Sequence, residues 1–599
     1  MKKPLTRAAV APELTWSLTD IFPTPKEWEE ELTLLMNILD EPFAYKGRLG
    51  EGADVLLSCL QSQEEIHARF LRVAAYASLG LSVDGTDSAH QIAAGRALAV
   101  GARWQALLSL VRSEIQSLPQ EEITSYLREE TELRSFEPML DRIMEEKQHM
   151  LEPDTERILA SLNEVLNAPS LVYQRAKTTD MKFAPAKDQD DREHPVTFST
   201  YEGRFELHPD PVLRRNAYAS FSQGLAAYQH TLGATWATEV KKNVVMARLR
   251  GYPSAIHMLL DEQQISPPVY HNLHDVILRE LAPHMRRYAR LRKRVLGLEE
   301  MLYCDIEAPL DPQFQPEVSF EEAGTMLREG LSVLGDEYVA IVDAALSNRW
   351  IDRADNVGKS TGAFCHSVYG VHPYILMTWN NSMRNVLTLA HELGHAGHGV
   401  LAQRHQRLAN CRTSMFFIEA PSTINEILVG KHILSNQHDS GMRRWLLMQR
   451  IMTYHHNFVR HLIEGELQRR LYAFAEKGVP ITTAHLNSAQ GDILDEFWGG
   501  EVTIDQGARL TWMRQPHYYR GLYPYTYSAG LTIGTAVARA LQEDGEAARE
   551  RWLQVLCAGG TRKPLELAQM AGVDMTRTES IKEAVDYVGQ MVDEVITLF

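Results

Sequence analysis

Cysteine is scarce in this sequence. Only five cysteines occur in 599 residues, an odd number scattered from Cys59 to Cys557 with no Cys-x-x-Cys pair. This pattern excludes a disulfide framework and a cysteine-based metal knot, and it favours a reducing compartment.

Long apolar runs are lacking too, because no uncharged stretch reaches about 18 residues. Prolines and Glu13 interrupt the N-terminal segment. We therefore expect no transmembrane helix and no signal peptide, and predict a cytoplasmic protein.

An excess of basic residues is also missing. The 61 lysines and arginines are outnumbered by 78 aspartates and glutamates, so the formal net charge is −17. Nucleic acid and anionic membranes both require a basic footprint, and we expect neither as a partner. The apolar fraction of 44% and the charged fraction of 23% are ordinary for a globular protein.

The chain is too long for a single core, so more than one domain is expected. The polar, proline-bounded stretch "FAPAKDQDDREHP" (183–195) is the best boundary. We predict a helical N-terminal domain over residues 1–190 and a second domain over 191–599.

Strand patterns are few. The best are "HPVTFSTYEGRFEL" (194–207) and "VHPYILMTW" (371–379), whereas most of the chain has apolar residues at helical spacing. In "TPKEWEEELTLLMNILD" (24–40), for example, apolar residues recur every three or four positions after a Thr-Pro start. The sequence therefore predicts a mainly α fold with a small amount of sheet.

The segment "LTLAHELGHAGHGV" (387–400) combines costly polar groups with an apolar helical pattern. His391, Glu392 and His395 form His-Glu-x-x-His, in which both imidazoles share one helix face and can hold one metal ion. Glu392 is rotated by about 100° from His391 and can reach a water molecule that the metal activates. The apolar flanks predict a buried helix, where imidazoles need partners such as a metal.

Small residues interrupt this helical pattern: Gly394, Ala396, Gly397 and Gly399. Such residues are useful where another backbone or a substrate must approach closely.

A catalytic zinc site needs a third protein ligand. The metzincin pattern fails, because His398 stands where glycine is required and Leu401 where the third histidine should be. His398 could orient a ligand, pack in the core or lie at a solvated helix end. Glu419 and Glu426 are better candidates, because they share a face if one helix spans both. One could bind the metal and the other orient a ligating histidine, but spacing alone does not assign the two roles.

"TLAHELGHAGHG", with Glu419 following 28 residues after His391 in "FIEAPSTINE", resembles the thimet-oligopeptidase-like (M3) zinc metallopeptidase family. Three further segments resemble its oligoendopeptidase F branch: "TWSLTDIF" (15–22), "TGAFCHSVYGVHPYILMTWNNS" (361–382) and "WMRQPHYYRGLYPYTYSAGL" (512–531). The resemblance covers nearly the whole chain in widely separated segments.

This resemblance implies one Zn²⁺ per chain, held by His391, His395 and Glu419. It implies that Glu392 is the general base and that Glu426 supports a ligand. The function that follows is zinc-dependent hydrolysis of internal peptide bonds in short oligopeptides.

The resemblance also assigns function to a C-terminal loop. It makes His517 and some of Tyr523, Tyr525 and Tyr527 hydrogen-bond donors to the oxyanion of the reaction. The tyrosines after His517 are spaced two and two, which departs from the thimet type, so the acting tyrosine is not fixed.

The implied architecture is two helical lobes flanking a deep substrate channel, with zinc at its floor and a small β-sheet nearby. Such a channel admits short unstructured peptides and excludes folded proteins. The segment 371–379 could supply an edge strand for an extended peptide, or it could be a buried strand without contact to substrate.

Two rival functions are a zinc carboxypeptidase of similar build and a peptide-binding protein without catalysis. A carboxypeptidase would need a basic residue for the substrate's terminal carboxylate, and Arg514 or Arg520 could serve. The presence of Glu392 argues against the non-catalytic alternative.

Overall fold

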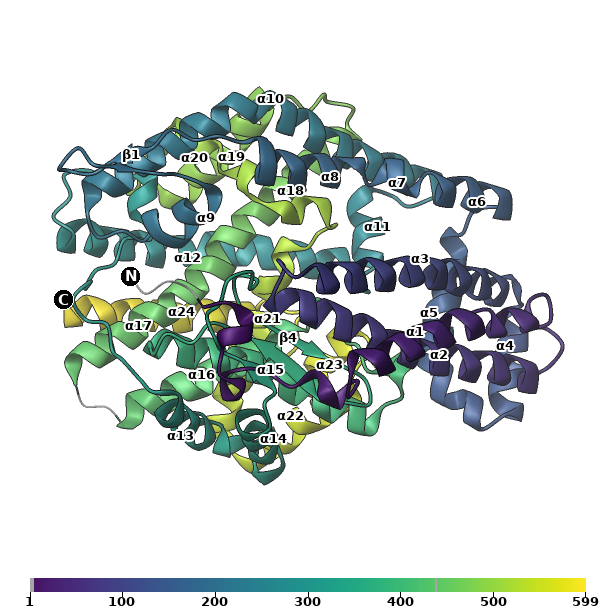
Figure 1. Cartoon of the computed structure of the whole chain (residues 1–599). Helices are drawn as coiled ribbons and strands as arrows, with labels where there is room; N and C mark the ends of the chain where they lie inside the picture. Colours follow the sequence, from purple (N-terminus) through teal and green to yellow (C-terminus); the bar gives the residue numbers. More distant parts are fainter. Residues whose placement is uncertain (1–4, 437–438) are drawn as a thin grey trace.

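The computed structural model describes residues 5–436 and 439–599, and helices dominate it (Figure 1). The N-terminal helices are α1 (Pro25–Ile38), α2 (Ala53–Val83), α3 (Ser88–Ser117), α4 (Gln120–Glu129) and α5 (Glu137–Glu145). The next group is α6 (Pro153–Ser161), α7 (Asn163–Leu166), α8 (Ala168–Arg175), α9 (Phe198–Thr200), α10 (Pro211–Leu249), α11 (Ala255–Asp261), α12 (Pro267–Val295), α13 (Phe320–Leu331) and α14 (Asp336–Ser347).

The remaining helices carry the predicted site and the C-terminal half of the core. They are α15 (Met383–His405), α16 (Glu419–Asn436), α17 (Ser440–Tyr454), α18 (His461–Glu476), α19 (Thr483–Trp498), α20 (Gln506–Arg509), α21 (Pro524–Glu543), α22 (Glu546–Ala558), α23 (Pro564–Met570) and α24 (Glu579–Leu598). In Figure 1, one lobe with α10, α18, α19 and α20 lies above a second lobe with α13–α16 and α22. The predicted mainly α, two-lobed fold is confirmed.

The predicted helix at 24–40 forms as α1, and its start shows the physical reason. The Thr24 hydroxyl accepts a hydrogen bond from the Glu27 backbone N–H at 3.3 Å, and the Glu27 carboxylate accepts one from the Thr24 N–H at 2.9 Å. This reciprocal cap satisfies two backbone donors that the first turn leaves free. Trp28, Leu32 and Leu35 then face the core at helical spacing.

The sheet near the predicted site has three strands in the order β3–β5–β4, with β3 at Ile351–Asp352, β4 at Phe364–Ser367 and β5 at Pro373–Leu376. β5 pairs in parallel with β3 and antiparallel with β4. The predicted strand at 371–379 is therefore confirmed, but it is the buried central strand. The free edge beside the site belongs to β4.

The predicted strand at 194–207 is wrong. Only a two-residue strand forms there, β2 (Glu193–His194), which pairs with β1 (Ala186–Lys187). Thr197 then caps α9, because its hydroxyl accepts a hydrogen bond from the Thr200 N–H at 3.1 Å. A helical turn follows over Tyr201–Phe205, and its two end residues are buried four positions apart. This local cap outweighs the weak alternation of apolar residues.

The central strand β5 joins two hydrophobic cores. Ile375 packs into the large core, which extends from Tyr173 to Val595 and includes the apolar face of α15. Its neighbours Tyr374 and Leu376 point the other way, into a small core with Trp16 near the N-terminus and apolar residues of α2. The sheet is therefore held between the N-terminal helices and α15. The domain boundary at residue 190 stays a prediction.

All five cysteines are free thiols. No helix in the described ranges is both long enough and apolar enough to span a bilayer.

The small residues of α15 allow α16 to approach closely. A Cβ atom on Gly394 would lie 2.5 Å from the Cα of Ser422, which is far inside van der Waals contact with the backbone of α16. This approach sets the separation of the two helices that carry the predicted metal ligands.

We therefore expect Gly394→Ala to push α15 and α16 apart, lowering both metal content and thermal stability. Overpacking of this kind costs about 1–3 kcal/mol. The measurements are zinc content after dialysis and the apparent Tm. Gly95→Ala is the matched control, because Gly95 lies in α3 with open space around it. That change should raise helix stability by about 0.5–1 kcal/mol and leave zinc content unchanged. Normal zinc content in Gly394→Ala would contradict the packing argument.

Candidate metal centre

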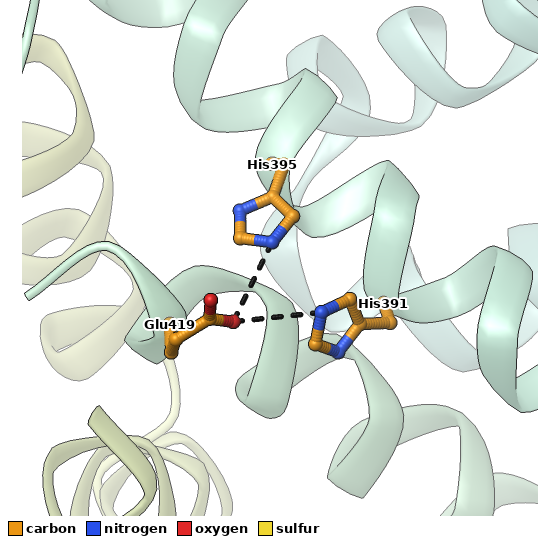
Figure 2. Close-up of side chains that lie close together, drawn as sticks. All are labelled: His391, His395 and Glu419. Atoms are coloured by element: carbon orange, nitrogen blue, oxygen red, sulfur yellow. Dashed lines mark ion pairs between the residues drawn. The ribbon is translucent and has the colours of Figure 1, made fainter. Parts of the chain in front are cut away.

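Three side chains from two adjacent helices converge on one point. His391 and His395 project from the same face of α15, and Glu419 is the first residue of α16 (Figure 2). The Oε2 atom of Glu419 lies 3.5 Å from the Nε2 atom of each histidine. All three donor atoms lie within 4.8 Å of one another.

These separations fit a single zinc ion. With metal–ligand bonds of about 2.0–2.1 Å, the donor atoms of a tetrahedral site lie about 3.3–3.4 Å apart. Two imidazoles and one carboxylate are a common catalytic zinc set that leaves one coordination position open. The residues present therefore match the metal in both chemistry and spacing.

Glu426 lies about two turns further along α16, on the same face as Glu419, and contacts the other side of His391. The His391 Nδ1 donates a hydrogen bond to the Glu426 Oε1 at 2.6 Å. Such a contact fixes the ring orientation and leaves Nε2 free for a metal. Glu419 and Glu426 thus occupy different places, one between the two Nε2 atoms and one behind His391.

The carboxylates strongly influence the pKa values of this cluster. Burial lowers the pKa of His391, but the hydrogen bond and charge of Glu426 outweigh it and raise that pKa to about 10. Burial likewise raises the pKa of Glu419, yet its contacts with His395 and His391 bring it down to about 2. A metal ion that binds here must displace a proton from His391.

Glu392 lies beside this cluster without belonging to it. Its side chain is buried, with 5% of the residue exposed, and burial raises its pKa against the opposing charges of His391 and His395. A buried carboxyl group whose pKa is raised binds a proton more readily than an exposed one, which suits a group that accepts a proton and then returns it.

Two large cavities meet at α15. One has a volume of about 850 Å³ and is lined by β4, α2 and the metal cluster. The other has a volume of about 700 Å³ and is lined by residues of α17 and the loop near His517. His391 and Glu392 contribute to the walls of both cavities. Cavities therefore lie on both sides of the three candidate metal ligands, with His391 and Glu392 in the wall of each, which fits the predicted channel.

The prediction of one C-terminal loop is wrong for the tyrosines, because Tyr525 and Tyr527 lie in the first turn of α21 and Tyr523 caps that helix. His517 and Tyr527 line the second cavity, and the Tyr527 hydroxyl lies 3.4 Å from that of Tyr523. Tyr525 points elsewhere, because it is fully buried and its hydroxyl donates to the Gln263 side chain at 2.7 Å. Tyr523, His517 and Tyr527 thus form one group, and Tyr525 packs behind it.

The structure also decides between the roles that the sequence left open for His398. His398 is buried, its Nε2 atom has no hydrogen-bond partner in the described chain, and burial lowers its pKa to about 4. It is a core histidine at the wall of the larger cavity.

Arg514 is not free to hold a substrate carboxylate. It donates two hydrogen bonds to Glu206 at 2.9 Å and one to Glu202 at 3.0 Å. Arg520 is exposed and does not line either cavity. Arg384 does line the second cavity and makes no ion pair among the described residues.

Sequence reasoning did not find two buried residues beside the loop, His461 and Glu464. The His461 Nδ1 donates to the Glu464 Oε2 at 2.9 Å. Burial lowers the pKa of His461 to about 3, and it raises the pKa of Glu464 to about 7. Their i, i+3 spacing was visible in the sequence, but the helix that carries them had no recognisable motif.

Comparison with known proteins agrees with this geometry. Residues 205–587 match the model of peptidase family M3, and residues 114–183 match that of oligopeptidase F. The chain is 31% identical to oligopeptidase PepF of Bacillus subtilis, over 98% of this chain and 88% of that protein. It is 28% identical to an oligoendopeptidase F homolog of Lactococcus lactis, over 96% of each chain.

A solved structure shows the same fold. The crystal structure of oligoendopeptidase-F from Enterococcus faecium superposes with a TM-score of 0.76 and 24% identity, covering 96% of this chain and 99% of that one.

The different places of Glu419 and Glu426 lead to a prediction about metal affinity. Glu419→Ala removes one of three donors and should leave the purified protein without tightly bound zinc. Glu426→Ala removes only the support of His391 and should weaken zinc binding by about 10–100-fold. Zinc affinity measured by competition with a chelator distinguishes the two variants. Retention of tight zinc by Glu419→Ala, with loss in Glu426→Ala, would reverse the assignment.

Proposed function

The chain belongs to peptidase family M3 and is thus a zinc metallopeptidase, and from that premise we propose that it cleaves internal bonds of short oligopeptides. The observation that carries this proposal is the metal cluster at 3.5 Å spacing, with Glu392 beside it in the wall of a channel. In this proposal His391, His395 and Glu419 bind one zinc ion, Glu426 orients His391, and Glu392 is the general base.

Bound zinc supplies Lewis-acid activation of water and of the scissile carbonyl group. Glu392 takes a proton from the attacking water molecule and passes it to the amide nitrogen that leaves. Its burial supports this role, because a carboxyl group shielded from bulk water can hold the proton between the two steps.

The free edge of β4 is suited to bind the peptide backbone. Residues 363–369 line the same cavity as His391 and Glu392. Among the strands that the structure describes, β4 pairs with β5 alone, on the side away from this free edge. An extended peptide added to this edge would be held by main-chain hydrogen bonds, which do not depend on side-chain identity. This mode of binding favours unstructured peptides of varied sequence, and it excludes folded proteins, whose backbones are not available.

His517 and Tyr527 are the proposed donors to the oxyanion, with Tyr523 supporting Tyr527. His517 and Tyr527 face the cavity that His391 and Glu392 also line. Tyr525 is left out of this role, because its hydroxyl is already bonded to Gln263.

Endopeptidase activity can be tested with an internally quenched peptide that is amidated at its C-terminus. The zinc-loaded protein should cleave it about as fast as the same peptide with a free carboxylate. Glu392→Gln should bind zinc normally but lose several orders of magnitude in turnover, because it cannot accept a proton. A requirement for the free carboxylate would instead indicate a carboxypeptidase that uses Arg384. Near-normal turnover of Glu392→Gln would mean that another group is the base.

A comparison of two tyrosines tests the loop assignment. Tyr527→Phe should lower kcat by about 10²–10³-fold, with KM changed by only a small factor, because the lost hydrogen bond forms in the transition state. Tyr525→Phe is the matched control, since it also removes one hydroxyl from the first turn of α21, but not one that faces the cavity. Its kcat should stay within a few-fold of the parent. Equal effects of the two substitutions on kcat would show that these tyrosines act only through packing.

A further inference from the structure

A second cluster of metal-binding side chains faces the same channel. Within the described residues, one other group besides the metal centre brings at least three such side chains together: His461, Glu464 and His517. Each offers a donor atom, and the three atoms lie within 4.8 Å of one another. The donor set, two imidazoles and one carboxylate, is the same as that of the first site.

The fold holds these donors in place. His461 and Glu464 lie one turn apart at the start of α18, and their side chains already touch at 2.9 Å. The ring of His461 stacks on Tyr527 with centroids 4.3 Å apart, and the ring of His517 lies 5.3 Å from it. A metal ion would therefore meet donors whose side-chain freedom is already restricted, which lowers the entropic cost of binding.

One nitrogen atom of the cluster has no hydrogen-bond partner among the described residues and is free to bind an ion. The Nδ1 atom of His517 is buried and has no hydrogen-bond partner in the described part of the chain. An imidazole nitrogen without a partner is available to bind a ligand or an ion, and here it lies next to two other donor atoms. Both histidines line the cavity of about 700 Å³, from which water can complete the coordination shell.

The surrounding charges make this a weaker site than the first. Arg460 and Arg514 line a small cavity together with Glu464, and their positive charges oppose a divalent cation. Glu206 offsets part of this effect, because it binds Arg514 at 2.9 Å and lies 3.9 Å from Arg460. The site should therefore fill only after the first one.

From these observations we propose that His461, Glu464 and His517 form a second, weaker site for zinc or a similar transition-metal ion, and that its occupation inhibits the peptidase. Imidazole nitrogen and carboxylate oxygen suit borderline ions such as Zn²⁺, Co²⁺ and Ni²⁺. Inhibition follows because an ion bound to the Nδ1 atom of His517 holds the ring in this cluster, so that the ring cannot turn to donate a hydrogen bond to the oxyanion. The inhibitory part rests on the proposed function, whereas the metal binding does not.

Metal binding is tested first, without reference to activity. The full-length protein with no histidine tag is prepared in the Glu392→Gln form, loaded with one zinc and dialysed against rising zinc chloride. Zinc per chain should rise from about one to about two. Adding Glu464→Gln, which keeps the shape of the side chain but removes its charge, should abolish the second equivalent and retain the first. His461→Gln is the second variant and should behave in the same way.

The matched control is His456→Gln. His456 lines the same cavity and its ring lies 4.4 Å from that of His461, but it is not part of the cluster. This variant should still bind two zinc ions. Retention of the first zinc in every variant shows that the protein is folded, so loss of the second is specific.

Activity is then followed with the quenched peptide in protein that carries Glu392. Excess zinc should inhibit the parent and His456→Gln alike, and Glu464→Gln should need at least about tenfold more zinc for the same inhibition. A single zinc per chain at millimolar zinc chloride would overturn the site. Equal loss of the second zinc in His456→Gln would also overturn it. If the parent is active and binds two zinc ions without being inhibited, the inhibitory part of the proposal is wrong. If the parent binds two zinc ions but has no peptidase activity, only the proposed function is contradicted.

Discussion

The close contact between α15 and α16 is the constraint on which the site depends. Each helix alone provides an incomplete set of donors: α15 carries the two histidines, and α16 carries Glu419 together with Glu426, which supports His391. Because Gly394 has no side chain, the backbone at Ser422 can lie against α15. This contact brings Glu419 to within 3.5 Å of both imidazoles and places Glu426 behind His391. The remainder of the two-lobed fold positions a channel along these helices.

Charge pairing explains why the buried site can hold so many charged groups at a tolerable cost. The carboxylates of Glu419 and Glu426 compensate the two imidazoles, and Arg514 is compensated by Glu202 and Glu206. Glu392 is different, since it is buried with no hydrogen bond to a cation in the described chain. A carboxyl group left without such a partner can exchange its proton, which is the property that the proposed chemistry requires.

How far the sequence could predict this arrangement depended on how many elements were involved. The relation of His391 to His395 was readable because one helix fixes it. The roles of Glu419 and Glu426 could not be predicted from the sequence, because both residues share a face of α16 and only the docking of α15 distinguishes them. Tyr525 and Tyr527 are two residues apart, so the turn of α21 sends them to different environments. His461 and Glu464 were missed because their partner His517 comes from a distant loop, and the strand at 194–207 failed because a local cap competed with it.

The alternation of side chains along β5 bears on the evolution of the chain. Tyr374 and Leu376 are covered by Trp16 and by α2, both of which lie outside the segment 205–587 that carries the peptidase family match. The catalytic segment therefore lacks a hydrophobic cover of its own for one face of its sheet. Removal of the N-terminal region would expose the side chains of Tyr374 and Leu376, so the fold of the sheet depends on both regions. Exchange of N-terminal modules between relatives would be restricted to those that preserve this interface.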